Sequence, residues 1–542
     1  MRPADLVVLS DRVLTPDVLA DPASAAPGFV AVRDGVIVAV GSGHDAAAWA
    51  DGAARVIDLG EGTLASGFID AHIHPVIGLK MARGLDLSGI TRRDEARAAI
   101  AEYAAGRDDE WILGWGLDPA VFEGGPWDNS LFDGLIDDRK AFVVFFDGHA
   151  ALVSDAALAL GGVTGRETFP DASFVGVDAA GRPTGMLHEM QAELLVMDHL
   201  PEQAFEERVD ELGALFRGMA ESGIVAGHML DLADPDSIPM LEELERRGDL
   251  AIRLRISPWA MPGFTEEDLA GLVALQGRAG RRWEVRGIKL MIDGTVDNGT
   301  AWLFEPDTKG ESTASLYLEP DEYARAVAYF HERGIPTTTH AIGDRGIAFV
   351  AETIAAQPDN GTRHRIEHIE TLPDEVLDRI IEAGAATSMQ PTHCTHYSKA
   401  DHSDNWSQRL GTERANRAWR IGDLRARGAT VALGSDWPIA PYDPRGIVAA
   451  AQLRRPAGRP EIAPVQPAQA ISAAHAVEGY TSEYWASVGE TGGRLEVGAR
   501  ADLTAFADDP LRTDPDAFAQ TVVLLTVVDG DVVVDRAGAR VG

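Results

Sequence analysis

Eight strand-like runs, several of them separated by segments with helical periodicity, constrain the fold of this chain more than any other feature. The runs cover residues 67–74, 223–229, 251–257, 285–292, 335–340, 363–368, 385–390 and 430–436. Helical periodicity marks the segments 202–222, 321–333 and 373–383. Strands that alternate with helices indicate a mainly parallel sheet. Eight such strands match a (β/α)8 TIM barrel, which we predict over residues 66–486 of an α/β fold.

The interval between the first and second strands is too long for a loop. It runs from Val76 to about Pro201, and the segments Trp111–Gly116 and Ala141–Phe146 have the composition of strands. Structureless loops of this length are uncommon in compact domains. We therefore predict an inserted subdomain over about residues 76–200, placed above the mouth of the barrel.

Short strand-like runs also occupy both ends of the chain. They cover residues 6–9, 29–33, 36–40 and 55–59 near the start, and 502–506, 521–528 and 532–535 near the end. Asp34-Gly35 between two of these runs is a strong signal for a two-residue hairpin turn. We expect residues 1–65 and 487–542 to form one small β-sandwich.

Charge and composition narrow the classes of partner. Lys and Arg number 48 against 85 Asp and Glu, for a formal net charge of −37 over 542 residues. A surface with this much negative charge should repel nucleic acid and anionic lipid. We therefore predict that neither is a partner. The single cysteine, Cys394, excludes an intrachain disulfide. Without a secretory signal or a long apolar run, the expected location is the cytoplasm.

Two histidines at the end of the first strand suggest metal chemistry. His72 and His74 are spaced i, i+2, which places both imidazoles on one face of an extended chain, and Pro75 ends the strand. Imidazole is the commonest side-chain metal ligand, and the carboxyl ends of barrel strands carry the active site. Two histidines on an exposed strand face are the alternative interpretation.

Four later strands end on groups that also bind metals. These groups are Lys289, His340, His368 and Asp436. A single histidine on a strand is more often structural, and Lys289 could instead form an ion pair inside the barrel. Their combination with the His-x-His strand nevertheless predicts one shared metal centre.

This pattern resembles that of the amidohydrolase superfamily, in which His-x-His, Lys, His, His and Asp lie on strands 1, 4, 5, 6 and 8. Segments 147–149, 185–187, 389–393 and 498–503 are most similar to the branch of YtcJ-like hydrolases and N-substituted formamide deformylase. The resemblance implies two divalent ions, with zinc expected, and a carbamylated Lys289 that bridges them. His72, His74 and Asp436 would hold one ion, and His340 and His368 the other.

The resemblance also implies the reaction, which is hydrolysis of a non-peptide C–N bond in an amide or formamide-like small molecule. Asp436 would act as the catalytic proton acceptor. His149, His393 and Trp437 are candidate substrate contacts, against packing or capping alternatives. We expect an uncharged or weakly polar substrate. Homodimers are common in the family, so a homodimer is an open alternative to a monomer.

Two other functions stay open at this point. A mononuclear deaminase of the same superfamily would usually lack the lysine and carry a glutamate where this chain has Gly343. A non-catalytic scaffold would have lost ligands, whereas all six positions are filled here. Both alternatives therefore rank behind the hydrolase.

Overall fold

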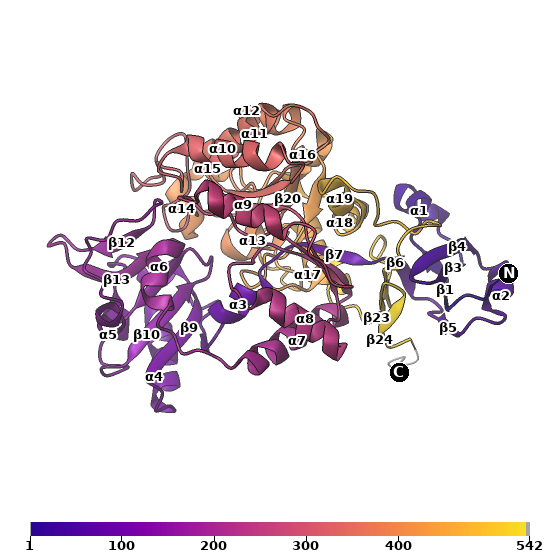
Figure 1. Ribbon diagram of the computed structural model, residues 1–542, viewed down its shortest axis with the longest axis horizontal. Coiled ribbons are helices and arrows are strands. Elements are labelled where there is room, and N and C mark those ends of the chain that lie inside the picture. The colour runs from indigo at the N-terminus through magenta and orange to yellow at the C-terminus, as the bar shows by residue number, and fades with distance from the viewer. Residues whose placement is uncertain (1, 538–542) are drawn as a thin grey trace.

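The computed structural model describes residues 2–537. Figure 1 shows a central body of helices and strands with a lobe on each side. One lobe contains β9, β10, β12 and β13, and the other contains the strands of the N-terminal segment together with β23 and β24 (Figure 1). Within the described residues, no helix is long and apolar enough to cross a membrane.

The central body contains two parallel sheets. The first has the order β16-β15-β14-β7 and the second the order β17-β18-β19-β20-β21. Their bounds are β7 (Phe68–Ile73), β14 (Ile224–Met229), β15 (Arg253–Ile256), β16 (Trp283–Val285), β17 (Ile288–Met291), β18 (Thr337–Ala341), β19 (Arg365–His368), β20 (Ala386–Met389) and β21 (Val431–Leu433). Every predicted strand is present, and the expected parallel α/β arrangement is confirmed.

The fourth predicted strand is divided between the two sheets at Gly287. This residue has φ of 116°, and a Cβ there would meet Ser257 Oγ at 2.8 Å. Only glycine adopts such a conformation without strain, so the chain bends between β16 and β17. The sequence pattern did not show this break, because residues 285–292 read as one continuous strand-like run.

Isolated bridges connect the outer strands of the two sheets. Ile73 bridges Trp437 on one side, and Trp259 bridges Lys289 on the other. The His74 N–H donates to the Trp437 carbonyl at 2.9 Å, and the Ala260 N–H donates to the Lys289 carbonyl at 2.8 Å. Among the described residues, a barrel closed by continuous strand pairing is therefore not seen, and the closed (β/α)8 barrel stays a prediction.

The predicted helices of the central body are confirmed. The predicted ranges 202–222, 321–333 and 373–383 correspond to α7 (Phe205–Glu221), α10 (Pro320–His331) and α12 (Asp374–Glu382). On α12, Val376, Leu377 and Ile380 form the buried face. Burying each such side chain contributes about 1.5–3 kcal/mol. Further helices are α3 (Pro75–Met81), α8 (Ser237–Arg247), α9 (Glu266–Leu275), α11 (Asp344–Ala355), α13 (Pro391–Tyr397), α14 (Asn405–Leu410), α17 (Pro444–Leu453) and α18 (Ala473–Gly479).

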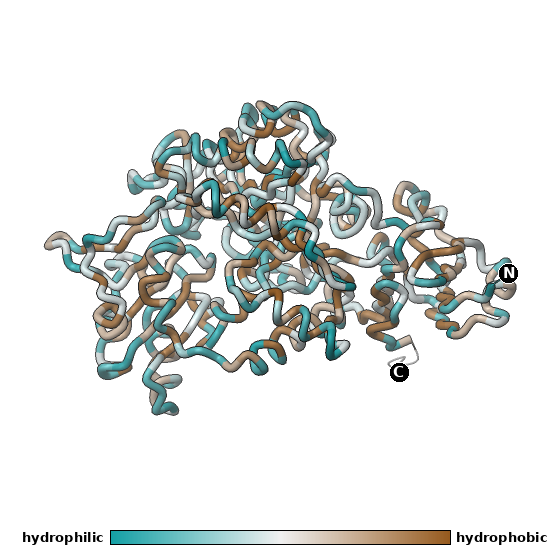
Figure 2. The backbone as a smooth tube through the Cα atoms, in the orientation of Figure 1, coloured by the Kyte–Doolittle hydropathy of each residue, from teal (hydrophilic) through white to brown (hydrophobic). Residues whose placement is uncertain are grey.

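The long interval after β7 carries its own six-stranded sheet, in the order β12-β13-β11-β10-β9-β8. The strands are β8 (Leu85–Asp86), β9 (Trp111–Leu117), β10 (Lys140–Phe145), β11 (Ala150–Val153), β12 (Phe174–Val177) and β13 (Pro183–His188), with α4 (Arg93–Ala105), α5 (Asp155–Leu160) and α6 (Met190–Met197). Hydrophobic segments run through this lobe as they do through the central body (Figure 2). The subdomain limits near residues 76 and 200 stay a prediction.

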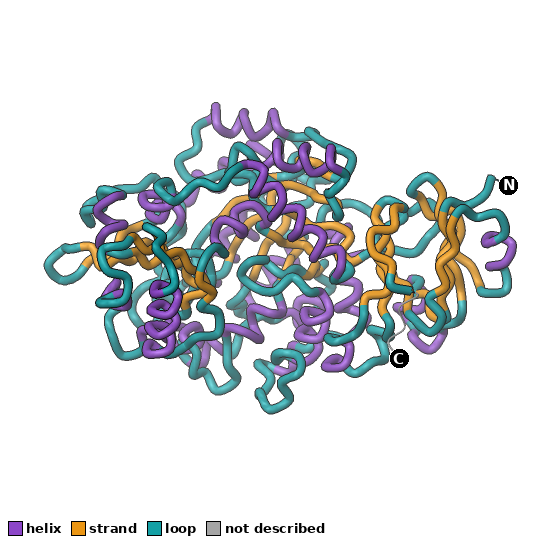
Figure 3. The backbone as a smooth tube through the Cα atoms, turned by 90° about the horizontal axis from the view of Figure 1, so that it is seen from below, coloured by secondary structure: helices purple, strands orange, loops and turns teal. Residues whose placement is uncertain are grey.

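Strands from both ends of the chain form two further sheets, which lie face to face in Figure 3. Their orders are β4-β3-β1-β5 and β2-β6-β22-β23-β24. The strands are β1 (Leu6–Ser10), β2 (Arg12–Val13), β3 (Gly28–Arg33), β4 (Val36–Ser42), β5 (Arg55–Asp58), β6 (Thr63–Ser66), β22 (Leu503–Phe506), β23 (Val523–Val528) and β24 (Asp531–Asp535). β6 pairs antiparallel with β22, which joins the two ends of the chain. The domain limits at residues 65 and 487 stay a prediction.

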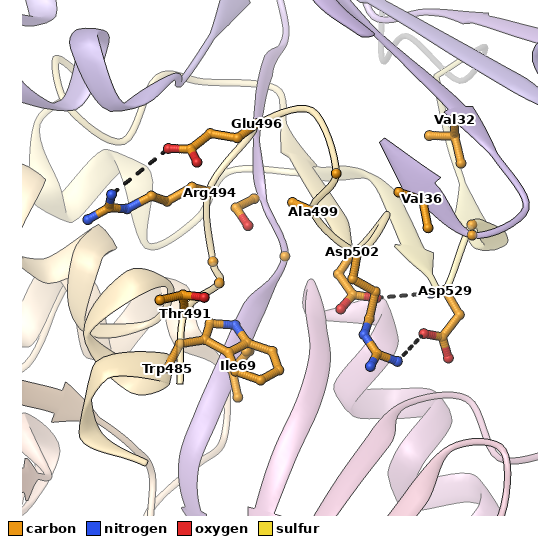
Figure 4. A pocket seen from close by; sticks show the side chains of 18 of the residues that line it. Val32, Val36, Ile69, Trp485, Thr491, Arg494, Glu496, Ala499, Asp502 and Asp529 are labelled. Carbon is orange, nitrogen blue, oxygen red and sulfur yellow. Dashed lines mark hydrogen bonds and ion pairs between the residues drawn. The ribbon is translucent and has the colours of Figure 1, made fainter. Parts of the chain in front are cut away.

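A large cavity lies where these terminal strands meet the central body. Ile69, Trp485, Asp502 and Asp529 are among its lining residues (Figure 4). Arg253 of β15 contacts the carboxylates of both Asp502 and Asp529, so partly buried ion pairs hold this junction together. None of the described residues that line this cavity is an expected metal ligand, so the candidate metal centre lies elsewhere.

Candidate metal centre

His72, His74 and Asp436 form the first group of side chains that could hold a metal ion. The Nε2 atoms of the two histidines lie 3.1 Å apart, and they are 3.3 and 3.2 Å from Asp436 Oδ1. Asp436 Oδ1 and His74 Nδ1 are buried without a hydrogen-bond partner among the described residues. The three converging donors are thus His72 Nε2, His74 Nε2 and the unpaired Asp436 Oδ1, a set of nitrogen and oxygen atoms that suits a divalent cation.

Close packing of β21 against β7 brings Asp436 to the histidines. A Cβ at Gly434 would meet the His72 backbone nitrogen at 2.7 Å, so only glycine fits at this contact. Asp70 Oδ1 accepts hydrogen bonds from the N–H groups of His72 and Ser435, at 3.1 and 2.9 Å. Asp436 itself has a positive φ of 59°. Such strained backbone is often found at functional sites.

Glu367 orients the ring of His72. The His72 Nδ1–H donates to Glu367 Oε2 at 2.8 Å, and both side chains are fully buried. Arg365 Nε donates to the other oxygen of Glu367 at 2.5 Å. With Nδ1 protonated, Nε2 carries the free lone pair that a metal needs. Burial and the positive charge of Lys289 lower the pKa of His72 well below its usual value, so the ring is neutral.

Lys289 lies next to these ligands. Its Nζ is 3.5 Å from His72 Nε2, and the side chain is 1% exposed. Burial lowers the pKa of Lys289 to about 8, against the opposing charges of Glu367 and Asp436. An appreciable fraction of this amine is therefore unprotonated near neutral pH, which suits a reactive lysine.

His368, His393 and Asp436 form a second group that could hold a metal. His368 Nδ1 and His393 Nε2 lie 3.8 and 3.7 Å from Asp436 Oδ2. His393 Nε2 is buried without a hydrogen-bond partner among the described residues. Asp436 thus belongs to both groups, which share its carboxylate.

His340 is close to this second group, but its Nε2 faces a backbone carbonyl. Its ring centroid is 4.5 Å from that of His368, yet its Nε2 lies 3.2 Å from the Gly294 carbonyl. The structure therefore brings all six predicted ligands together, but it places His393 rather than His340 in the second group. Burial lowers the pKa of His340 and of His368 well below the usual value.

His149, which belongs to the inserted lobe, lines a cavity next to the ligand cluster. His149 Nδ1 lies 2.8 Å from Glu189 Oε2, and its ring centroid is 5.0 Å from that of His340. Although burial opposes protonation, the charge of Glu189 raises the pKa of His149 to about 9. His149 therefore presents a hydrogen-bond donor from the lobe toward the ligand cluster. Apolar side chains line the same cavity: Ile77, Met81, Met190 and Met291.

A family model described as the amidohydrolase family matches residues 55–534. The chain belongs to the amidohydrolase family. It is 28% identical to the YtcJ protein of Bacillus subtilis over 94% of this chain and 96% of that one. It is 24% identical to N-substituted formamide deformylase of Arthrobacter pascens over 99% of each.

Solved structures show the same fold. A metal-dependent hydrolase of Pyrococcus horikoshii aligns with a TM-score of 0.71 at 21% identity, over 94% of this chain and 99% of that one. Atrazine chlorohydrolase TrzN of Arthrobacter aurescens, solved with zinc, aligns with a TM-score of 0.53 at 15% identity, over 98% and 96%. The α/β fold of this amidohydrolase is thus shared with metal-dependent hydrolases, and family membership supports hydrolase activity.

Trp437 lies apart from the other predicted substrate contacts of the amidohydrolase chain. A Cβ at Gly78 would meet the Trp437 ring at 2.8 Å, and the ring packs against a core cluster that includes residues of α7 and α8. Among the described residues, Pro438 and Ile439 line the cavity instead. His149 and His393 do line cavities next to the ligand cluster.

Sequence reasoning missed Glu367 and Arg365. The charged residues of β19 alternate in a strand that is buried throughout, and this pattern could have revealed an internal ion pair. The sequence does not show that Glu367 contacts His72, because the two residues lie 295 positions apart.

Proposed function

We propose that this amidohydrolase is a metal-dependent enzyme that hydrolyses a non-peptide C–N bond in a small amide or formamide-like molecule. The observation that carries the proposal is the pair of ligand groups that meet at Asp436. The printed name of the deformylase relative supports a formamide-like bond. The bridges at both edges of the two sheets support a closed (β/α)8 barrel around this site.

The donor set fits two divalent ions, with zinc as the expected metal. Imidazole and carboxylate donors suit zinc. His72 and His74 with Asp436 would hold one ion, and His368 with His340 or His393 would hold the other. A bound divalent cation supplies Lewis acidity, which polarises a substrate carbonyl and acidifies water near neutral pH.

Lys289 is the proposed bridging position in its carbamylated form. Its buried Nζ lies 3.5 Å from His72 Nε2, and Lys289 lines one cavity with His74 and His368. Its lowered pKa leaves free amine to react with carbon dioxide. A carbamate would add two oxygen donors between the groups.

Asp436 is the proposed catalytic residue. Its carboxylate would accept the proton of the attacking water as the oxygen bonds to the carbonyl carbon, and would pass that proton to the nitrogen as the C–N bond breaks. Although burial raises it, the proximity of His74 holds the pKa of Asp436 below its usual value. The carboxylate is therefore ionised and ready to accept a proton. His149 would donate a hydrogen bond to the substrate.

Turnover of N-formyl, N-acetyl and cyclic amides by zinc-loaded protein tests this function, with Asp436→Asn as the variant. The wild type should release amine, and the variant should lose about two orders of magnitude or more in rate, the scale of acid–base catalysis. Turnover of phosphotriesters or esters alone would contradict the proposed bond specificity. Full activity of the variant would show that Asp436 does not transfer the proton.

The structure speaks against the deaminase alternative at one position. A Cβ at Gly343 would meet the Trp302 carbonyl oxygen at 2.2 Å, so a glutamate does not fit there without a backbone shift. Metal analysis separates the alternatives, since two ions per chain support the hydrolase, one the deaminase and none the scaffold. A homodimer and a small-molecule substrate as the sole partner stay predictions.

A further inference from the structure

A second cavity adjoins the apolar one at the ligand cluster and shares His340, His368 and Asp436 with it. Six of its lining residues matter here, namely Phe146, Asp147, Asp297, Glu370, Tyr397 and Trp406. Apart from histidines, every charged side chain among the described residues that line it is a carboxylate. We call it the acidic side cavity. Its carboxylates come from the inserted lobe, from the loop after β17 and from the end of β19.

Two of these carboxylates are buried and accept a hydrogen bond through one oxygen only. Asp297 and Glu370 are each 7% exposed. Asn405 Nδ2 donates to Asp297 Oδ1 at 2.8 Å, and Trp406 Nε1 donates to Glu370 Oε2 at 2.8 Å. Among the described residues, neither Asp297 Oδ2 nor Glu370 Oε1 receives a hydrogen bond. Glu370 Oε1 lies 3.9 Å from His393 Nδ1. Burial and the neighbouring charge of Asp147 raise the pKa of Asp297 well above its usual value, so a nearby cation would stabilise its carboxylate form.

Aromatic rings complete the wall. Phe146 from the lobe stacks on Tyr397 of α13 with centroids 4.2 Å apart, and Trp406 of α14 packs on Trp419 at 4.6 Å. The Tyr397 hydroxyl donates to the Ile439 carbonyl, which fixes its ring at the cavity. Aromatic faces attract organic cations, most strongly where water is excluded.

The two cavities share the reacting end of the site. His340, His368 and Asp436 line both of them. One cavity continues past Asp147 and Glu189 between the apolar side chains of Ile77, Met81 and Met190. The other continues between the carboxylates of Asp297 and Glu370 and the aromatic rings. A molecule whose scissile bond lies at Asp436 would therefore place an apolar group on one side and face the carboxylates on the other.

We propose that the acidic side cavity binds an ammonium group of the substrate, so that the amidohydrolase prefers small amides with an apolar group on one side and a cationic amine on the other. This inference rests on the proposed function and revises the expectation of an uncharged substrate. Among the described residues, Asp147, Asp297 and Glu370 form no group with the spacing of metal ligands, which favours an organic cation.

The first test compares matched amides on zinc-loaded protein. The pair is a monobenzoylated diaminobutane and the neutral benzamide in which a methyl group replaces the ammonium. We expect kcat/KM to favour the cationic amide by about tenfold or more, the scale of a desolvated charge pair. Asp297→Asn should reduce this ratio toward one, and Glu370→Gln should reduce it independently.

Exposed Glu207 on α7 supplies the matched control. Glu207→Gln removes the same charge outside the cavity and should leave the preference unchanged. A wild-type preference of less than twofold, or equal loss in the control, would overturn the inference. Thermal melting identifies any variant that does not fold. If one of the two cavity variants fails to fold, the other one decides whether the preference depends on the cavity.

The second test separates the cavity from the reaction. Calorimetric titration with butylammonium chloride, against butanol, measures binding without turnover. We expect only the ammonium to bind, with affinity falling about tenfold or more in Asp297→Asn. Ammonium binding without turnover of any amide would leave the cavity assignment in place and contradict the proposed hydrolase. Amide turnover without ammonium binding would contradict the cavity assignment and leave the proposed hydrolase in place.

Discussion

His72 and Glu367, 295 residues apart in the chain, meet through a hydrogen bond of 2.8 Å between Nδ1 and Oε2. Both side chains are fully buried, and Arg365 holds the second oxygen of Glu367. This contact sets the tautomer of His72, so that Nε2 faces His74 and Asp436 with a free lone pair. The ligand cluster therefore depends on a carboxylate that binds no metal itself.

Glu367→Gln should weaken metal binding. The amide is neutral, and it can present an N–H to His72 Nδ1, which disfavours the required tautomer. Loss of such a supporting carboxylate typically costs about 10–100-fold in metal affinity. Competition with a chromogenic chelator measures this, with Glu375→Gln on the exposed face of α12 as control. Equal affinity in Glu367→Gln and wild type would show that the contact does not tune the site.

Lys289→Ala should lower the metal content of the purified protein. If a carbamate bridges the two groups, added acetate or propionate should restore part of the metal and part of the activity, because a small carboxylate fills the space of the lost side chain. Elemental analysis with and without acetate gives the answer. Full metal content in the untreated variant would contradict a bridging role for Lys289.

Separate substitutions of His393 and His340 distinguish the two candidate donors of the second group. The geometry places His393 Nε2 near Asp436 and His340 Nε2 near the Gly294 carbonyl. We expect His393→Asn to lower the metal content from two ions toward one per chain. His340→Asn should do so less. The opposite order would return His393 to a substrate contact and would confirm the ligand set that the family resemblance implies.

Acid should destabilise the fold through His364, away from the metal site. The His331 Nε2–H donates to the Pro358 carbonyl at 2.7 Å, so its Nδ1 accepts from the His364 Nε2–H at 2.9 Å. His364 Nδ1 accepts the Thr337 N–H at 3.1 Å, which leaves no free site for another proton. Burial lowers the pKa of His364 to about 4.

The unfolded chain, with a histidine pKa near 6.5, binds more protons than the folded chain between about pH 6.5 and 4. Stability therefore falls as pH falls through this window, by up to about 3 kcal/mol. The difference in urea midpoint between pH 7 and pH 5 should be smaller in His364→Asn than in wild type. Exposed His475→Asn should keep the wild-type difference. An equal pH response in His364→Asn would mean that His364 titrates normally.

The strand pattern predicted much of the fold because parallel strands end at the same edge of a sheet. The same rule predicts that His72, Lys289, His340, His368 and Asp436 lie together. The division of the fourth strand was not predictable, since it depends on the positive φ of Gly287. The sequence could not show that the sheets meet only at isolated bridges, because such bridges depend on packing in three dimensions.

The end of β19 shows why part of the site escaped prediction. Strand periodicity places Glu367 and His368 on opposite faces. In the structure both reach His72, because His368 has a positive φ of 71° that turns the chain at the strand end. Similarly, Trp437 follows Asp436 directly, yet its ring packs on α3 while Pro438 and Ile439 line the cavity. Backbone turns that a sequence does not display decided these positions.

The most direct measurement is amide turnover by one protein sample before metal removal, after dialysis against a chelator and after return of zinc. The account predicts release of amine from an N-formyl or N-acetyl amine by the starting sample, loss of at least about 100-fold after chelation and recovery with zinc. Undiminished turnover by metal-free protein, or no turnover of any amide by the zinc-loaded protein, would contradict it.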